Sequence, residues 1–437
     1  MSEKPRTEPA RGMRDFLPDD LRRREYVVGV IKRTYERYGF EPLETPAVEN
    51  IETLLGKYGE EGNQLIFKIL MRGEHEATGK ADLALRYDLT VPLARVVAHH
   101  QARLPRLFKR YQIQPVWRAD RPARGRFREF YQCDVDALGS TSPAVEAELC
   151  SAVSDVLTEL GFNDFVIRLN HRALLTALLS SAGVSPTLHG DALIAIDKLD
   201  KIGPDGVKQE FALRGIDATA AATVLSVFAQ SDLDVLARAA GNEGAAPIEN
   251  LRLIQTLANN PRLKVDPSLA RGLSYYTGAI MEINVPDLAG SLGGGGRYDN
   301  LVGMFLGQSV PACGFSLGLE RILVVMGERN MFPATLATTP ADVMLAAFDA
   351  ASIPCALRVA GLLRTAGLRV FVYPDPDKIG KQIKYADGRG IPFVAIVGEN
   401  EVKDGTVTVK HLAAQTQTTY GQSEAGSKIL EVLKHRG

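Results

Sequence analysis

The alternation of apolar and polar side chains predicts a helix near the start of the chain and an extended segment after it. Between residues 20 and 38, apolar side chains recur at a helical period with arginine and lysine between them, and Gly39 follows as a stop signal. Residues 40–45 are expected to be extended, and Pro42 and Pro46 confine that segment to a sheet edge or a special junction.

Later runs with the length and composition of strands predict an antiparallel sheet. These runs lie at residues 65–71, 82–87, 106–117 and 126–138. A helix is expected at residues 145–160, and a strand at 165–169. The first part of the chain therefore reads as a sheet with helices packed on it.

The composition changes after this region. Residues 171–260 are rich in alanine and leucine at helical spacing, and we interpret them as a helical insertion between two sheet-forming regions. Strands resume at 279–283 and 314–316, and a helix is expected at 318–328.

A run of proline, alanine and threonine at residues 332–340 resembles a linker, and strands and helices alternate beyond it. The expected strands are 343–347, 369–373, 393–397 and a final edge strand at 406–409, with helices at 353–366 and 379–389. The pattern predicts an α+β protein with a separate small α/β domain. The expected boundaries are 1–170 and 261–330 for the two parts of the core, 171–260 for the insertion, 331–340 for the linker and 341–437 for the last domain.

Composition narrows the class of protein. The chain has 437 residues, is 45% hydrophobic and 24% charged, and balances 51 Lys+Arg against 52 Asp+Glu. It contains neither an apolar run of about 18 residues nor a secretory leader, so we expect no membrane span. Its four cysteines are scattered, which indicates reduced thiols in a cytoplasm and argues against structural zinc. A net charge of −1 means that contact with RNA must come from local patches.

One such patch is a predicted arginine hairpin. Residues 101–130 carry nine Lys/Arg and only two acids, and a turn at Gly125 divides the arginines into two arms flanked by aromatic residues. Guanidinium forks and aromatic faces suit a polyphosphate with an attached base. The alternative is a solvated basic hairpin without a ligand.

Polar residues on two neighbouring segments are typical of a ligand pocket. Asp88 and Thr90 close a strand, and an isolated Asp-x-Thr either binds an ammonium group or caps a helix. After the hairpin, Gln132, Asp134 and Asp136 alternate with apolar residues and share one strand face. We interpret that face as a wet pocket wall, with a core position as the alternative.

Two glycine-rich segments indicate backbone that a ligand approaches closely. In one of them, Tyr275 and Tyr276 lie between glycines and follow Arg271, and in the other, four glycines at 293–296 precede an Arg-Tyr-Asp sequence. P-loop, dinucleotide-binding and kinase motifs are absent. The pair His99-His100 lacks further ligands at metal spacing, and we interpret it as surface histidines.

Taken together, these segments resemble a class II aminoacyl-tRNA synthetase, and within that class the histidyl-tRNA synthetase family. The N-terminal Arg-Gly-Met-Arg-Asp-Phe-Leu-Pro is similar to that family's signature, and the first helix with Pro46 is similar to motif 1 of the dimer interface. Residues 117–130 are similar to motif 2, and residues 314–321 are similar to motif 3. Residues 271–278 and 293–299 resemble two segments that are specific to this family. The class I signatures are absent.

The resemblance implies an ATP site. Arg118 would bind the α-phosphate and the substrate carboxylate, and Arg126 would hold the β- and γ-phosphates. Phe130 and Arg321 would enclose the adenine, and Arg271 would lie opposite Arg118 at the reacting phosphorus. Mg²⁺ would bridge the phosphates of ATP, with no metal held by protein ligands alone.

The resemblance also implies a histidine site and further partners. The α-amino group would be held by Asp88, Leu89 and Thr90 with Gln132 nearby, and the imidazole would be read by Asp136, Tyr275 and Tyr276. The implied reaction joins L-histidine to tRNA(His), the last domain would bind the anticodon, and the chain would act as a homodimer.

Some positions depart from the family pattern. Ser274 replaces an aspartate, Asp120 replaces a glutamate, and Asp88-Leu89-Thr90 replaces Glu-Gly-Thr; the last two resemble a eukaryotic-type branch. Three other classes compete with the synthetase: the regulatory subunit of ATP phosphoribosyltransferase, an RNA-binding or signalling derivative without activity, and another class II synthetase. The last domain and the intact phosphate arginines argue against the regulatory subunit. The presence of Arg118 and Arg271 argues against an inactive derivative, and the tyrosine segment at 271–278 argues against another class II synthetase.

Overall fold

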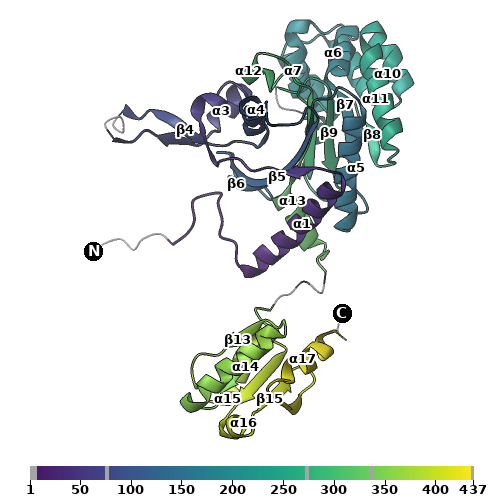
Figure 1. Ribbon diagram of the computed structural model, residues 1–437. Helices are drawn as coiled ribbons and strands as arrows, with labels where there is room; N and C mark the ends of the chain where they lie inside the picture. Colours follow the sequence, from purple (N-terminus) through teal and green to yellow (C-terminus); the bar gives the residue numbers. More distant parts are fainter. Residues whose placement is uncertain (1–6, 74–77, 271–274, 334–335, 337–338, 435–437) are drawn as a thin grey trace. The chain divides into compact units, whose positions relative to one another are not determined.

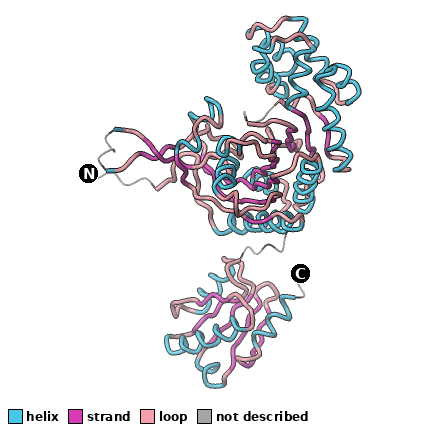
Figure 2. The backbone as a smooth tube through the Cα atoms, turned by 45° about the horizontal axis from the view of Figure 1, so that its top comes forward, coloured by secondary structure: helices cyan, strands magenta, loops and turns pink. Residues whose placement is uncertain are grey.

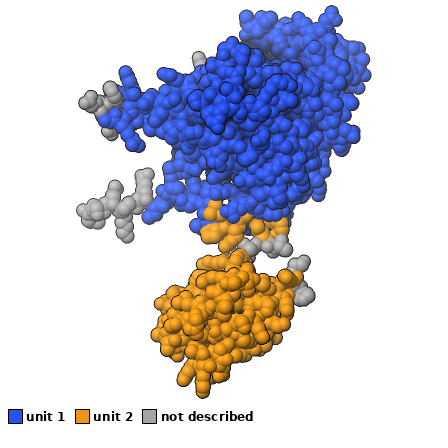
Figure 3. All heavy atoms as spheres, viewed as in Figure 1, with its two compact units in different colours: residues 1–17, 23–331 blue, residues 18–22, 332–437 orange. Residues whose placement is uncertain are grey.

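The chain folds into two compact units, residues 1–17 with 23–331 and residues 18–22 with 332–437, coloured separately in Figure 3. The computed structural model describes residues 7–73, 78–270, 275–333, 336 and 339–434. Each unit is described by itself below.

The first unit is built on an eight-stranded sheet with the strand order β1-β5-β6-β11-β10-β9-β7-β8. The strands are β1 (Glu41–Pro42), β5 (Phe108–Trp117), β6 (Glu129–Leu138), β7 (Val166–His171), β8 (Leu263–Val265), β9 (Ala279–Asn284), β10 (Gly293–Arg297) and β11 (Ala312–Gly318). Pairing is antiparallel except where β1 meets β5 and β7 meets β8 at the two ends. The predicted antiparallel sheet is confirmed.

One face of this sheet is covered by helices. The helices α1 (Pro18–Arg37), α5 (Ala144–Glu159) and α13 (Leu319–Glu328) lie along it, as Figure 1 shows. Cys133 and Val135, which point to this face, are fully buried. Alternation along β6 then directs the even-numbered residues to the opposite face.

Residues 171–260, predicted to be a helical insertion, form helices that gather beside β7 and β8 in Figure 1. The helices are α6 (Arg172–Ser181), α7 (His189–Ile196), α8 (Leu199–Leu213), α9 (Ala218–Phe228), α10 (Leu233–Ala240) and α11 (Ala245–Ala258). Asp217 and Asp232 accept hydrogen bonds from backbone N–H groups in the first turns of α9 and α10, which explains where these helices begin.

The prediction of a single sheet was wrong for two strands. Here β3 (Lys68–Leu70) and β4 (Ala81–Leu85) join β2 (Val48–Asn50) in a separate three-stranded sheet, which projects from the unit in Figures 1 and 2. Three short helices complete this region: α2 (Ile51–Leu54), α3 (Gly59–Gln64) and α4 (Thr90–His99). Strand-like composition identifies strands but does not say which strands pair.

The second unit contains a five-stranded sheet with the order β13-β12-β14-β15-β16. Its elements are β12 (Val343–Ala347), α14 (Ile353–Thr365), β13 (Val370–Val372), α15 (Ile379–Gly388), β14 (Phe393–Val397), α16 (Glu399–Asp404), β15 (Thr406–His411), β16 (Thr416–Gly421) and α17 (Ala425–Lys434). The expected edge position of residues 406–409 was wrong, because β16 pairs outside β15. The polar and largely exposed residues of β16 give no apolar pattern to detect.

Buried Arg86 joins three segments of the first unit. Its guanidinium donates to the carbonyl oxygens of Thr45 and Pro46 at 2.6 and 3.2 Å, to that of Pro115 at 2.8 Å, and to Gln114 Oε1 at 3.0 Å. These bonds fix the predicted motif 1 junction against β5.

Replacing Arg86 with methionine is expected to lower the free energy of unfolding by about 3–5 kcal/mol, because several buried acceptors lose a charged donor at once. Urea unfolding measures this change. Arg33→Met is the control, since Arg33 is exposed and forms a surface pair with Glu159. Its expected effect is below about 1 kcal/mol. Equal effects of the two substitutions would contradict this role of Arg86.

Candidate active site

Polar side chains form two rows across the face of the large sheet that lies opposite α1, α5 and α13. Residues directly opposite one another on paired strands point to the same side. The first row is Arg110, Asp136, Gly314 and Gly296, and the second is Gln112, Asp134, Ser316 and Gly294. Each row runs from long side chains on β5 and β6 to small or absent ones on β11 and β10.

A pocket lies where these rows lose their side chains. It is small, with about 20 Å³ of space in this structure, and its lining is mainly polar. Its side-chain lining comes mainly from Thr90, Asp134, Asp136, Tyr276, Tyr298 and Ser316. The glycine run supplies its floor as strand β10 in the sheet interior, which the sequence did not indicate.

Close packing requires glycine at the floor of the pocket. A Cβ atom on Gly314 would lie 1.8 Å from Asp136 Oδ1, and one on Gly295 would lie 2.1 Å from the carbonyl oxygen of Gly314. The missing Cβ atoms make room for Asp136 and for neighbouring strands of the protein itself, and the close approach of a ligand to this backbone stays a prediction.

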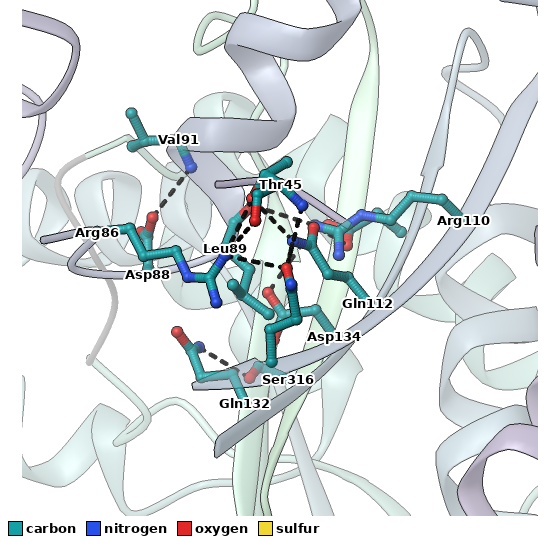
Figure 4. A network of polar contacts seen from close by, with 12 residues as sticks. Thr45, Arg86, Asp88, Leu89, Val91, Arg110, Gln112, Gln132, Asp134 and Ser316 are labelled. Atoms are coloured by element: carbon teal, nitrogen blue, oxygen red, sulfur yellow. Dashed lines mark hydrogen bonds and ion pairs between the residues drawn. The ribbon is translucent and has the colours of Figure 1, made fainter. Parts of the chain in front are cut away.

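Two buried carboxyl groups face the pocket beside one guanidinium. Arg110 Nη2 lies 2.9 Å from Asp136 Oδ2 and 3.9 Å from Asp134 Oδ2, and the Tyr298 hydroxyl donates to Asp136 Oδ1. Burial raises the pKa of Asp134 to about 7 and raises the pKa of Asp136, against the opposing effect of Arg110. Figure 4 shows Arg110, Gln112, Asp134, Gln132 and Ser316 converging.

Asp88 has one of the two roles that the sequence left open, that of a helix cap. Its Oδ1 accepts from the backbone N–H of Val91 in the first turn of α4 and from the Tyr58 hydroxyl, both at 3.0 Å. The Tyr275 hydroxyl lies 3.4 Å from Oδ2. Burial raises the pKa of Asp88, and the nearby Arg118 opposes that shift. Asp88 therefore caps a helix and also belongs to a buried tyrosine cluster next to the pocket.

The arginine hairpin lies beside this cluster. Arg118 Nε donates to the carbonyl oxygen of Tyr87 at 3.0 Å, and its guanidinium lies 4.4 Å from the Tyr87 ring centre and 5.2 Å from that of Phe130. Arg126, in the other arm, is about half exposed and pairs with Asp120 at 3.0 Å.

The hairpin turn also approaches the start of α13. A Cβ atom on Gly125 would lie 3.3 Å from Arg321 Cγ. Arg321 donates to the carbonyl oxygen of Ser291, and its neighbour Glu320 is buried and accepts from the backbone N–H of Tyr131. The turn of the predicted motif 2 hairpin and Arg321 of the predicted motif 3 thus lie close together.

The structure brings together some predicted site residues and separates others. Thr90, Asp136 and Tyr276 line one pocket, whereas Tyr275 contacts Asp88 and Gln132 donates to Ser316 Oγ at 2.9 Å. Leu89 is fully buried, and its carbonyl oxygen lies 3.4 Å from Arg110 Nη2. Arg271 and Ser274 lie outside the described residues.

Sequence reasoning missed three residues of the site. Tyr298 and Arg110 hold Asp136, and Tyr58 holds Asp88. A signal for Arg110 existed: Arg110, Gln112 and Gln114 alternate along a strand with apolar neighbours, as Gln132, Asp134 and Asp136 do. Tyr58 carries no comparable signal, because it is a lone tyrosine outside any strand pattern.

Comparison with known proteins identifies the family. The family model described as histidyl-tRNA synthetase matches residues 12–322, and the one described as anticodon binding domain matches 342–432. Proteins named histidine–tRNA ligase from Flavobacterium johnsoniae and Gloeobacter violaceus are both 41% identical to this chain. The matches cover 94% and 97% of this chain and 96% and 98% of those proteins.

Solved structures agree with this result. The crystal structure of histidyl-tRNA synthetase from Nostoc sp. PCC 7120 has a TM-score of 0.82 at 32% identity, covering 98% of this chain and 100% of that one. A Bacillus halodurans structure titled as an ATP phosphoribosyltransferase regulatory subunit/histidyl-tRNA synthetase shares the fold, with a TM-score of 0.72 at 19% identity over 91% of this chain and 99% of that one. The sequence resemblance is confirmed: this chain belongs to the histidyl-tRNA synthetase family.

Proposed function

We infer that this chain is a histidine–tRNA ligase that acts in translation. It would activate L-histidine with ATP to give histidyl-adenylate and pyrophosphate, and then transfer histidine to the 3′ end of tRNA(His). Family membership over nearly the whole chain carries this conclusion. The polar pocket of Asp136, Tyr276 and Thr90 supports it, as does Arg118 beside Tyr87 and Phe130.

The activation step brings two anions together. A histidine carboxylate oxygen attacks the α-phosphorus of ATP, and negative charge accumulates there until pyrophosphate leaves. We assign Arg118 to this phosphate and carboxylate, with Arg271 opposite it, because fixed guanidinium groups stabilise such charge without reorganising. No covalent protein nucleophile is needed.

The remaining ATP contacts follow from the hairpin. Arg126 would hold the β- and γ-phosphates, exchanging its exposed pair with Asp120 for a doubly charged partner. Phe130 and Arg321 would enclose the adenine. The position of Phe130 beside Arg118 and the approach of Arg321 to the hairpin turn support this arrangement.

Mg²⁺ is proposed to enter with ATP as an ion bound to its phosphates. Among the described residues, no three His, Cys, Asp or Glu side chains gather as a protein metal site. We propose no protein ligands for the ion, and the roles assigned here are those of the arginines.

Histidine selection would rest on pairing both ring nitrogens. Neutral imidazole has one donor and one acceptor, and Asp136 and the tyrosine hydroxyls supply the complementary groups. The Asp88-Leu89-Thr90 segment would hold the α-amino group, with Gln132 nearby. A site that must pair buried polar groups rejects analogues lacking them by about 10⁴–10⁵, which makes a separate editing domain unnecessary.

The last domain is proposed to bind the anticodon of tRNA(His). Its helix α15 presents exposed Lys381 and Lys384 together with the ring of Tyr385, which are residue types that bind phosphates and stack on bases. A regulatory paralogue without aminoacylation is disfavoured because this domain and the phosphate arginines are both present.

Removing residues 332–437 should weaken tRNA charging far more than adenylate formation. The active-site pocket lies wholly in the first unit, whereas a nearly neutral chain needs a second surface to hold a long RNA. Charging of tRNA(His) and histidine-dependent ATP–pyrophosphate exchange are measured on the same preparation, so that the exchange serves as the control. Equal losses in the two assays would refute anticodon binding by this domain.

We also propose that the active form is a homodimer in the cytoplasm. The motif 1 segment, which carries the expected dimer contacts, is held in place by Arg86. None of the helices within the described ranges has the length and apolarity to span a bilayer. Sedimentation of the purified full chain, with and without tRNA, tests the dimer directly.

A further inference from the structure

Arg110 is a buried cation without enough hydrogen-bond acceptors. Its side chain is fully buried, and its Nε and Nη1 atoms have no hydrogen-bond partner in the structure. Asp134 Oδ1 and Gln112 Oε1 nearby are also buried and unpartnered. Buried polar groups are rarely left unpaired, so the cluster of Arg110, Gln112 and Asp134 has capacity for further hydrogen bonds.

The charges of the cluster do not cancel. One guanidinium faces two carboxyl groups, with Arg110 nearer to Asp136 (2.9 Å) than to Asp134 (3.9 Å). The other groups that act on this pair include the neutral hydroxyls of Tyr298, Ser316, Tyr276 and Tyr35 and the more distant carboxyl of Asp88. Two ionised carboxylates that are buried side by side repel each other, and such a pair tends to share a proton.

We propose that Arg110 is a positioning residue for histidine recognition, which balances the charge of Asp134 and so keeps Asp136 ionised and correctly oriented to accept the imidazole N–H. This proposal rests on the proposed histidine site. Asp134, which also lines the pocket, then acts as the second member of a balanced pair.

The charge balance between Arg110 and Asp134 predicts that substituting both residues does less harm than substituting either one. Removing Arg110 leaves two carboxyl groups to share a proton, and Asp136 loses its role as a fixed acceptor. Removing only the charge of Asp134 leaves Arg110 paired with Asp136 alone. Asp136 then accepts a hydrogen bond from the neutral imidazole ring of histidine less strongly. Removing both charges together restores one carboxylate, held by Tyr298, and should recover histidine binding.

The test compares Arg110→Gln, Asp134→Asn and the double variant of the full-length chain by histidine-dependent ATP–pyrophosphate exchange. Each single substitution should raise KM for histidine by about 10- to 100-fold, the factor expected for a charged hydrogen bond, with KM for ATP changed less than about twofold. The double variant should return to within about fivefold of the original KM. A structural role alone would lower kcat and affect both substrates.

Additive losses in the double variant, or single variants with an unchanged KM for histidine, would overturn the proposal. Thermal unfolding is measured on all proteins; should Arg110→Gln fail to fold, the double variant must still bind histidine more tightly than Asp134→Asn. An original chain that gives no exchange with histidine would refute the proposed function itself. Normal exchange with unaffected variants would refute only the role of Arg110.

Discussion

Arg118→Ala is expected to lower kcat for histidine-dependent ATP–pyrophosphate exchange by about 10²–10³ without unfolding the protein. Arg118 is only partly buried, and among the described residues its side chain donates one hydrogen bond, to the carbonyl oxygen of Tyr87. Its proposed task is to stabilise charge that exists only as the carboxylate attacks phosphorus, so the loss should fall on kcat more than on the affinity for ATP.

Two further variants sharpen this experiment. Arg118→Lys keeps the charge but loses the planar fork, and should recover only a small part of the rate. Arg103→Ala, in the same basic segment but exposed, is the matched control and should leave exchange unchanged. Arg271→Ala should resemble Arg118→Ala. Exchange near the original rate in Arg118→Ala would remove Arg118 from the reaction.

Gly314→Ala is expected to raise KM for histidine by about 10²-fold while the fold is retained. The new methyl group would occupy the position of Asp136 Oδ1, so the Asp136 side chain must rotate away from Tyr298 and Arg110. Loss of two contacts to a charged group accounts for the magnitude. Steady-state kinetics with varied histidine, at saturating ATP, measures the effect.

Gly327→Ala provides the control for this substitution. Gly327 lies in helix α13, and a Cβ atom there would meet nothing within 4 Å. Alanine should be neutral, or should stabilise the helix by up to about 1 kcal/mol. Similar kinetics in the two glycine variants would show that Asp136 does not need its observed position for histidine binding.

Much of the fold could be predicted because helical and strand periods differ clearly along this chain. The first helix, the helical insertion and the alternating last domain each have long, regular patterns. Strand pairing could not be predicted, since strand-like runs mark β4 and β5 as strands but do not show that the two enter different sheets. The edge strand β16 was missed because its exposed threonines and glutamine carry no apolar alternation.

The site was predictable only in part, for a physical reason. The polar face of Gln132, Asp134 and Asp136 follows from strand alternation within one segment. The partner that sets its charge, Arg110, lies on another strand, and only the register of β5 against β6 places it opposite Asp136. The glycine run was recognised as unusual, but its position as a central strand also depends on pairing.

The proposed function depends on a pocket that accepts the histidine imidazole and on arginines that promote attack by the histidine carboxylate. ATP–pyrophosphate exchange measured separately with each of the twenty amino acids tests both parts at once. We expect rapid exchange with histidine and at least about 10⁴-fold slower exchange with every other amino acid. Faster exchange with a different amino acid, or none with histidine, would contradict it.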